Sequence, residues 1–244
     1  MKKNQGIITV GKLWTRRKIV TVLLIFFFML SSIIAVLTYY GQNVGCFTIS
    51  LAEEVSNQSI YVSTDPTFSS YSPRLVCDSF SQAKAIPYSV IKTGYVRETN
   101  GVYADSGNSY IGYTYYIKNM GDESVTLQVD MGIASVTKNA DEAVWVWYFS
   151  GEDDDKGRMF QKEDDLTNVP DNWTGYDQTY REREYFKDDY TVFTEKNYVL
   201  EPGEVKKTTL IIWLEGMDPD CDDNILGGQI NFNIEYTLYN EADE

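Results

Sequence analysis

The residues best suited to chemistry form an acidic run in this 244-residue chain, which reads DPDCDDN from Asp218 onward. Asp218, Asp220 and Asp222 alternate along it, and alternating carboxylates are typical of calcium-binding loops. An EF-hand would require Gly and Glu where this chain has Asp223 and Gln229. Two interpretations therefore stay open: a looser Ca²⁺ site formed by the three alternating aspartates, or a solvated acidic loop that binds no cofactor.

Other catalytic chemistry is restricted because the chain contains no histidine. This excludes Ser-His-Asp and Cys-His relays, His-ligated zinc sites and HExxH metalloprotease helices. Two carboxylates can hydrolyse a glycoside, but no local motif among the 36 acids marks an acid and a base. The 5 Trp and 19 Tyr could line a glycan groove, although aromatic side chains more often fill a core. We therefore expect no catalytic residues and a non-enzymatic role, with a carboxylate-dependent hydrolase or a glycan-binding module as alternatives.

The chain has three cysteines, Cys46, Cys77 and Cys221. Exported domains form disulfides, and an odd count leaves one cysteine over. Cys77 and Cys221 both lie well beyond the apolar segment described next, so we expect them to pair if any pair forms. Three thiols without a bond are the alternative, because connectivity cannot be deduced from sequence.

A long uncharged segment occupies residues 19–40 and reads IVTVLLIFFFMLSSIIAVLTYY. About 20 helical residues cross the roughly 30 Å hydrocarbon core of a bilayer, so the segment predicts one transmembrane helix. The cations that precede it are Lys2, Lys3, Lys12, Arg16, Arg17 and Lys18, and the first 40 residues contain no acid. Positive flanks stay in the cytoplasm. We therefore expect a cytoplasmic basic segment at 1–18, a signal anchor in the lipid bilayer of the cell membrane, and an extracellular C-terminal domain.

A cleaved signal peptide is the alternative to this anchor. Its apolar region is usually about 7–15 residues long and is followed by a small-residue cleavage site. The segment here is longer, and Thr38, Tyr39 and Tyr40 match such a site poorly. An uncleaved anchor is therefore the first hypothesis, and a secreted subunit of a biofilm-matrix type of fibre is the second.

The residues beyond position 40 carry 15 of the 21 cations and all 36 acids. This acidic balance argues against nucleic-acid binding, which requires a positive field. After a short linker at 41–46, alternating or continuous apolar residues at strand length indicate a β domain over 47–244. The predicted strands are 47–51, 110–117, 125–133, 143–149, 206–214 and 229–238, and the fifth follows a Pro-Gly turn.

Six strands without a strong amphipathic helix favour a mainly β fold, an antiparallel β-sandwich of the immunoglobulin-like or jelly-roll-like kind. About 190 residues exceed what such a sandwich needs, so we expect an inserted acidic loop at 151–190. Within that loop, the sequence REREYFKDD predicts a short helix over 181–189. The apolar run at 143–149 suits a strand that is buried on both faces.

Two segments carry a family resemblance: LEPGEVKKTTLIIWLEGMDPDCDDNILGGQINF at residues 200–232 and YIGYTYYIKNMGDESV at 110–125. They resemble a family of uncharacterised single-pass surface proteins of Gram-positive bacteria, which share a basic N-terminus, one span, an FTISL-like first strand and a PGE…IWLEGxDPxC…GG block. The resemblance implies a surface-exposed β-sandwich and supplies no activity. At a greater distance, the PGE turn is similar to that of camelysin and the biofilm matrix fibre proteins. Self-assembly, other surface proteins and cell-wall glycans are the partners we expect beside the bilayer.

Overall fold

A computed structural model of the chain describes residues 18–32, 47–77, 83–104, 109–151, 154, 156–168, 175–176 and 182–240. The chain divides into two compact units, Met1–Val44 and Gly45–Glu244. Residues 1–17 of the predicted basic segment at 1–18, and the whole predicted linker at 41–46, lie outside the described residues.

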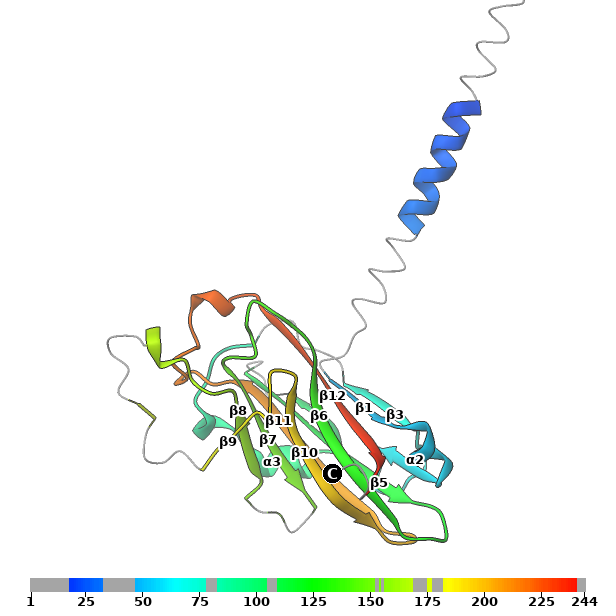
Figure 1. Cartoon of the computed structure of the whole chain (residues 1–244), viewed down its shortest axis with the longest axis vertical. Helices are drawn as coiled ribbons and strands as arrows, with labels where there is room; N and C mark the ends of the chain where they lie inside the picture. The colour runs from blue at the N-terminus through cyan, green and yellow to red at the C-terminus, as the bar shows by residue number, and fades with distance from the viewer. Residues whose placement is uncertain are drawn as a thin grey trace, which may run out of the picture. The chain divides into compact units, whose positions relative to one another are not determined.

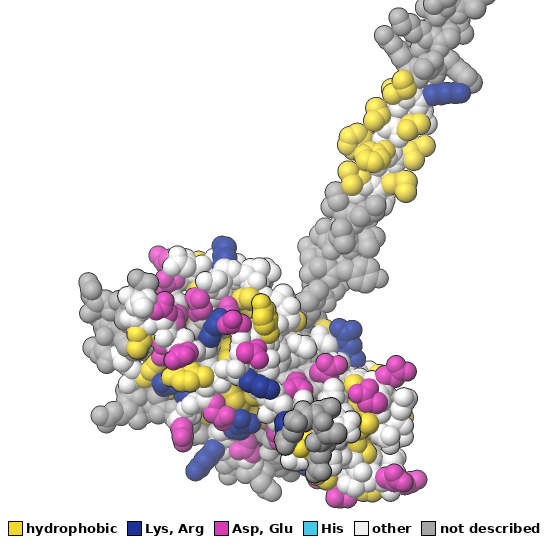
Figure 2. Space-filling view, in the orientation of Figure 1, with side chains coloured by type: hydrophobic (Ala, Val, Ile, Leu, Met, Phe, Trp, Pro, Cys, Tyr) yellow, Lys and Arg dark blue, Asp and Glu magenta, His cyan; other side chains and the backbone are white. Residues whose placement is uncertain are grey.

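In the first unit, residues 18–32 form a helix. Its large apolar side chains are exposed over fractions that run from 41 % at Leu30 to 75 % at Phe28, and Figure 2 shows them around the helix. Residues 33–40 of the predicted span lie outside the described part of the chain. Among the described residues, no helix is long and apolar enough to cross a membrane.

The second unit is mainly β, as the sequence predicts (Figure 1). Its strands are β1 (Phe47–Leu51), β2 (Ile60–Ser63), β3 (Arg74–Cys77), β4 (Gly101–Ala104), β5 (Tyr110–Asn119), β6 (Val125–Thr137), β7 (Val144–Ser150), β8 (Arg158–Gln161), β9 (Glu184–Tyr185), β10 (Thr191–Leu200), β11 (Val205–Leu214) and β12 (Gln229–Leu238). The helical elements are short: α2 (Glu53–Asn57), α3 (Thr93–Glu98), η1 (Tyr88–Val90), η2 (Leu166–Asn168) and η3 (Asp223–Ile225). All six strands predicted from sequence are present.

The strands form two sheets. One has five strands in the order β10-β6-β12-β1-β3, and the other has seven, with β2-β5-β11-β7-β8-β9 in order and β4 also paired with β5. The expectation of a purely antiparallel fold is wrong, because β1 runs parallel to β12 and β8 runs parallel to β9. Alternation in a sequence shows which face of a strand is buried, but it does not show the direction of the neighbouring strand.

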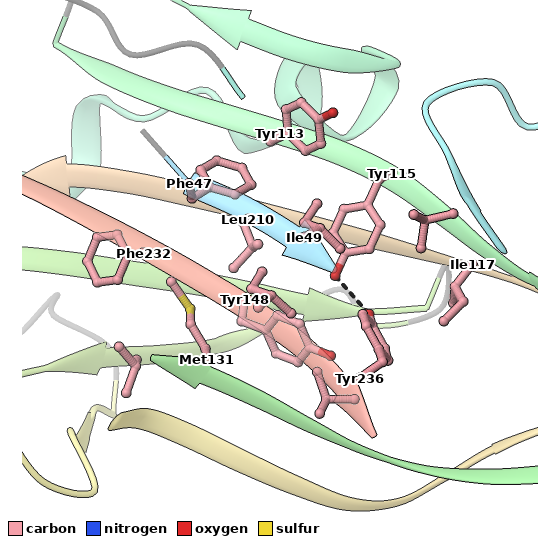
Figure 3. Packing of buried hydrophobic residues seen from close by; sticks show 14 of the residues in the cluster. Phe47, Ile49, Tyr113, Tyr115, Ile117, Met131, Tyr148, Leu210, Phe232 and Tyr236 are labelled. Carbon is pink, nitrogen blue, oxygen red and sulfur yellow. Dashed lines mark hydrogen bonds between the residues drawn. The ribbon is translucent and has the colours of Figure 1, made fainter. Parts of the chain in front are cut away.

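One hydrophobic core lies between the two sheets and takes side chains from both (Figure 3). Along β6 the residues alternate between buried and half-buried up to Ile133, with Val125, Leu127, Val129 and Met131 on the core side. In β12 the core side is that of Phe232, Ile234 and Tyr236. This period of two is the pattern that predicted the strands.

The strand β7 is buried on both faces, as its continuous apolar run predicts. Val144, Val146 and Tyr148 join the core between the sheets, whereas Trp145, Trp147 and Phe149 belong to a second cluster. That second cluster lies on the outer face of the seven-stranded sheet and includes Val96 of α3. Gly112 of β5 permits this contact, since a Cβ atom there would lie 2.1 Å from a methyl group of Val96.

Two local predictions had different outcomes. The Pro-Gly turn before β11 is confirmed: Gly203 has a φ of 77° and the Glu204 N–H donates to the Glu201 carbonyl over 2.9 Å. The helix predicted at 181–189 is wrong, because the described part of this segment holds β9 and a tight turn into β10. Arg158 of β8 donates two hydrogen bonds, of 2.6 and 2.8 Å, to the carboxylate of Glu184 in the neighbouring strand β9.

Candidate functional site

The candidate site lies at one end of the seven-stranded sheet, where three neighbouring strands begin or end. β11 and β8 end there and β7 begins there, because β7 is antiparallel to both. The loop from Glu215 to Gly228 follows β11, and residues 162–168 follow β8. Segments that are far apart in the chain therefore bring their acids together.

Three aspartates meet at this end of the sheet. Asp164, Asp218 and Asp220 each place a carboxylate oxygen within 4.8 Å of the others, and we call them the acidic trio. The predicted set contributes Asp218 and Asp220, while Asp164 comes from the inserted loop. Asp164 belongs to the run Glu163–Asp165, which is acidic in sequence, but nothing local indicates that it meets residues 54 positions away.

The third predicted ligand, Asp222, is not part of the trio. Its side chain accepts a hydrogen bond of 2.7 Å from the Asn224 N–H and caps η3. A carboxylate at a helix N-terminus in this way satisfies a backbone donor that would otherwise have no partner. The alternating spacing of the acidic run therefore serves two purposes in the structure: two acids turn toward Asp164, and the third holds the loop.

Asp218 is the most enclosed member of the trio, with 4 % of its surface exposed. The Trp145 indole N–H donates to Oδ2 over 2.7 Å, and the Asp220 N–H donates to Oδ1 over 2.9 Å. Burial raises the pKa of Asp218 to about 7, an effect that these two hydrogen bonds only partly oppose. The nearby carboxylates of the trio raise this pKa further.

The other two members are half-buried. Asp164 Oδ1 accepts hydrogen bonds of 2.8 Å from Gln161 Nε2 and from the Tyr176 hydroxyl. Asp220 Oδ2 accepts one of 2.9 Å from the Asp165 N–H. Burial raises the pKa of both carboxyl groups, so all three acids lie where water stabilises their negative charge poorly.

Aromatic rings form one wall of the site. Tyr176 lies 5.5 Å from Trp145 between ring centroids, and Trp145 lies 5.9 Å from Trp213. The Arg183 guanidinium lies 4.1 Å from the Tyr176 centroid and 5.3 Å from that of Trp145. This cation favours the charged form of Asp164.

Sequence reasoning missed Glu215, the first residue after β11. Its side chain is fully buried, and its carboxylate accepts from the Tyr88 N–H over 2.8 Å and from Trp213 Nε1 and the Met217 N–H over 3.0 Å each. A signal was present, because an acid directly after the apolar run LIIWL is either exposed or held by donors. Glu215 fixes the start of the loop that carries two members of the trio.

Cys77 and Cys221, the pair expected from the sequence if a disulfide forms, are not joined to each other in the structure. Cys77 is buried at the end of β3 in the five-stranded sheet, whereas Cys221 is half-buried in the loop beside the trio. Burial raises the pKa of the Cys221 thiol to about 11, and the carboxylate of Asp218 adds to this rise. The thiol is therefore protonated at neutral pH and is a weak nucleophile and a weak metal ligand. Cys46 lies outside the described residues.

No protein-family model, curated protein or solved structure matches the chain. The chemical argument consequently depends on the described residues alone. Three carboxylates in one half-enclosed place can share a proton, bind a hard cation, or act as acid and base on a substrate that reaches them.

Proposed function

We propose that the chain is a membrane-anchored surface protein whose β unit lies outside the cell and acts by binding, in adhesion or in assembly of the cell envelope. The charge pattern around residues 19–40 carries this proposal. All the cations of the first 40 residues precede the apolar segment, and all 36 acids follow it. Such an arrangement favours a cytoplasmic N-terminus.

The helix over residues 18–32 supports an apolar environment for this segment. Its side chains from Ile19 to Leu30 include no charge, and the large apolar ones are exposed along the whole described helix. Apolar side chains exposed in a row mark a site of association with lipid or with another protein. The length of the uncharged sequence, which exceeds that of the described helix, favours lipid.

Binding rather than hydrolysis is supported by the burial of the acids. In a glycosidase the two carboxyl groups stand about 5 Å or more apart and both must reach the sugar. The trio oxygens lie within 4.8 Å of one another, and Asp218 has the raised pKa of a general acid. Its 4 % exposure, however, leaves a substrate almost no access, and Glu215 is held by three N–H donors.

The sheet edges favour binding through loops over assembly by strand addition. At one edge of the five-stranded sheet, β10 has two register irregularities and carries Glu195, Lys196 and the positive-φ residue Asn197. Bulges and charges of this kind protect an edge strand against pairing with another chain. At the opposite edge of the same sheet, β3 has only four residues. In the seven-stranded sheet, β4, which pairs with β5, also has only four. An anchored binding protein is therefore better supported than a secreted fibre subunit.

Topology is tested with the full chain expressed in a bacterial membrane and tagged at the C-terminus. Protease added to intact cells should remove the tag, while a tag placed before Met1 should be protected. Intact mass spectrometry should show that residues 1–40 are retained. A C-terminal tag that is protected, or a mature chain that lacks the first 40 residues, would contradict the anchored topology.

Binding is tested separately, with the detergent-solubilised full chain and purified cell-wall material. We expect sedimentation of the chain with the wall fraction and a monomer by native mass spectrometry. A panel of glycan substrates provides the comparison for hydrolysis. Turnover of any substrate, or long oligomers with no wall binding, would contradict the proposed role.

A further inference from the structure

We propose that the acidic trio is a Ca²⁺ site that ties the inserted loop to the loop after β11, with Gln161 as a fourth oxygen donor. This inference concerns a ligand and goes beyond the proposed surface function. It depends on the trio's geometry and on one buried amide oxygen that has no partner in the described part of the chain.

The first observation is the convergence of three carboxylates from two distant segments. Their oxygens lie within 4.8 Å of one another, which is close enough for one cation to contact all three after small side-chain rotations. Ca²⁺ is bound by oxygen atoms at about 2.3–2.6 Å, so two ligands on opposite sides of the ion are about 5 Å apart. The spacing of the trio fits that span.

The second observation concerns a neutral side chain beside the acids. Gln161 is fully buried, and its amide extends to the trio, where Nε2 donates to Asp164 over 2.8 Å. The other amide atom, Oε1, is buried and has no hydrogen-bond partner among the residues that the structure describes. A buried acceptor without a donor costs stability, and an amide carbonyl is an established type of Ca²⁺ ligand. Rotation of the amide would break the Nε2–Asp164 hydrogen bond and turn Oε1 toward the trio, where a cation shared with Asp164 would replace that bond.

The third observation is the shortage of positive charge. Among the described residues, no Lys or Arg forms an ion pair with Asp164, Asp218 or Asp220. Arg183 acts on Asp164 from its position over the ring of Tyr176. One cation cannot balance three carboxylates whose charges repel one another, so the site has a net negative charge that a divalent ion would neutralise.

The donor chemistry selects the metal. All the candidate ligands are oxygen atoms, which favours a hard cation. The ligands come from loops rather than from a rigid octahedral frame, and flexible oxygen sites suit Ca²⁺ better than Mg²⁺. Extracellular Ca²⁺ modules bind with Kd values of about 10⁻⁴–10⁻³ M, which is the affinity we expect here.

Terbium luminescence offers a direct test with the detergent-solubilised full chain. Tb³⁺ replaces Ca²⁺ in oxygen sites, and Trp145 would sensitise it because its indole contacts Asp218. We expect emission on excitation of tryptophan, displacement of Tb³⁺ by Ca²⁺ at millimolar concentration, and weaker displacement by Mg²⁺. Ca²⁺ alone should also raise the thermal midpoint, since it binds only the folded state.

Variants separate the trio from general acidity. Asp164→Asn, at a half-buried position, should lower the affinity for Ca²⁺ at least tenfold. Asp222→Asn, two residues from Asp220 and still able to cap η3, should leave it unchanged. Gln161→Leu should weaken Ca²⁺ without loss of the fold, because it removes an amide that is only partly satisfied. Absence of sensitised emission and of a Ca²⁺-dependent midpoint, or equal effects of Asp164→Asn and Asp222→Asn, would overturn the proposal.

Discussion

Polar side chains are buried on both faces of the seven-stranded sheet, but they are satisfied to different degrees. On the outer face, Glu215 and Asp218 accept hydrogen bonds at both carboxylate oxygens. Between the sheets, the Tyr115 and Tyr236 hydroxyls bond to each other over 2.8 Å (Figure 3). Tyr148, also in that core, has a buried hydroxyl that has no hydrogen-bond partner among the residues the structure describes. Glu215 and Asp218 are therefore hydrogen-bonded at every carboxylate oxygen, whereas the tyrosine hydroxyls between the sheets are satisfied only in part.

The largest effect should come from Glu215. Glu215→Ala removes the acceptor of three N–H donors, and hydrogen bonds to a charged group contribute about 1.5–3 kcal/mol each. We expect the free energy of unfolding to fall by about 5 kcal/mol, measured by urea unfolding with tryptophan fluorescence. Glu215→Gln, which retains one acceptor oxygen, should cost less. Glu98→Ala, an exposed acid at the end of α3, is the control and should change stability by less than about 0.5 kcal/mol.

The next effect concerns pH and Asp218. Its pKa of about 7 in the folded state lies above the ordinary value of 3.8, so the folded state binds the proton more tightly. Its contribution to stability is complete below pH 4 and is lost as the pH rises to about 7. The contribution amounts to at most about 4 kcal/mol. Asp218→Asn should flatten this part of the pH profile in calcium-free buffer.

Other groups face Asp218 and contribute to the same profile. They are Asp164, Asp220, Cys221 and Tyr176, and Arg183 acts on the neighbouring Asp164. The carboxyl groups of Asp164 and Asp220 have raised pKa values too, so the flattening should be partial. Asp222→Asn should keep the full slope, and a profile that is identical for Asp218→Asn and the unmodified chain would show that Asp218 does not retain its proton.

A smaller loss is expected at Tyr115. Tyr115→Phe leaves the Tyr236 hydroxyl fully buried without its partner, which should cost about 1–2 kcal/mol. Tyr236→Phe should cost a similar amount for the same reason. The double variant, which removes both hydroxyls, should recover part of the loss in a double-mutant cycle. Strict additivity would contradict the direct bond.

The smallest effect should come from Tyr148. Because its hydroxyl has no partner among the described residues, Tyr148→Phe should leave the free energy of unfolding within about 0.5 kcal/mol of the unmodified value, or raise it slightly. Tyr198→Phe serves as a second example, since that hydroxyl also lacks a partner in the described part of the chain. A loss as large as that of Tyr115→Phe would instead indicate a buried water molecule that bridges these hydroxyls.

Much of this architecture follows from local sequence patterns. The period-two alternation of β6 and β12 and the continuous run of β7 correctly predicted strands and buried faces. β10 was missed, because the segment TVFTEKNYVL carries charges at its centre where the strand has an irregular register. The segment at 181–189 was assigned to a helix because its charged composition suits one, but its pairing with β8 decides its conformation.

The candidate site was predictable only in part. Asp218 and Asp220 stand out by their spacing in one loop, but their third neighbour, Asp164, is brought in by the register of β7 between β8 and β11. Tertiary contacts of this kind leave no periodic trace in a sequence. The same holds for the donors on Glu215, one of which is the backbone of Tyr88, 127 residues away.

The parallel pairing of β1 with β12 has a consequence for how the chain matures. Ser50 and Ile234, whose strands are neighbours, are 184 residues apart. Such long-range pairing forms slowly. As the ribosome releases the chain, β1 emerges early but lacks one of its two partners until the last strand is complete. The five-stranded sheet therefore closes only on a finished polypeptide, and a chain that stalls before β12 leaves open strand edges that favour its aggregation or degradation.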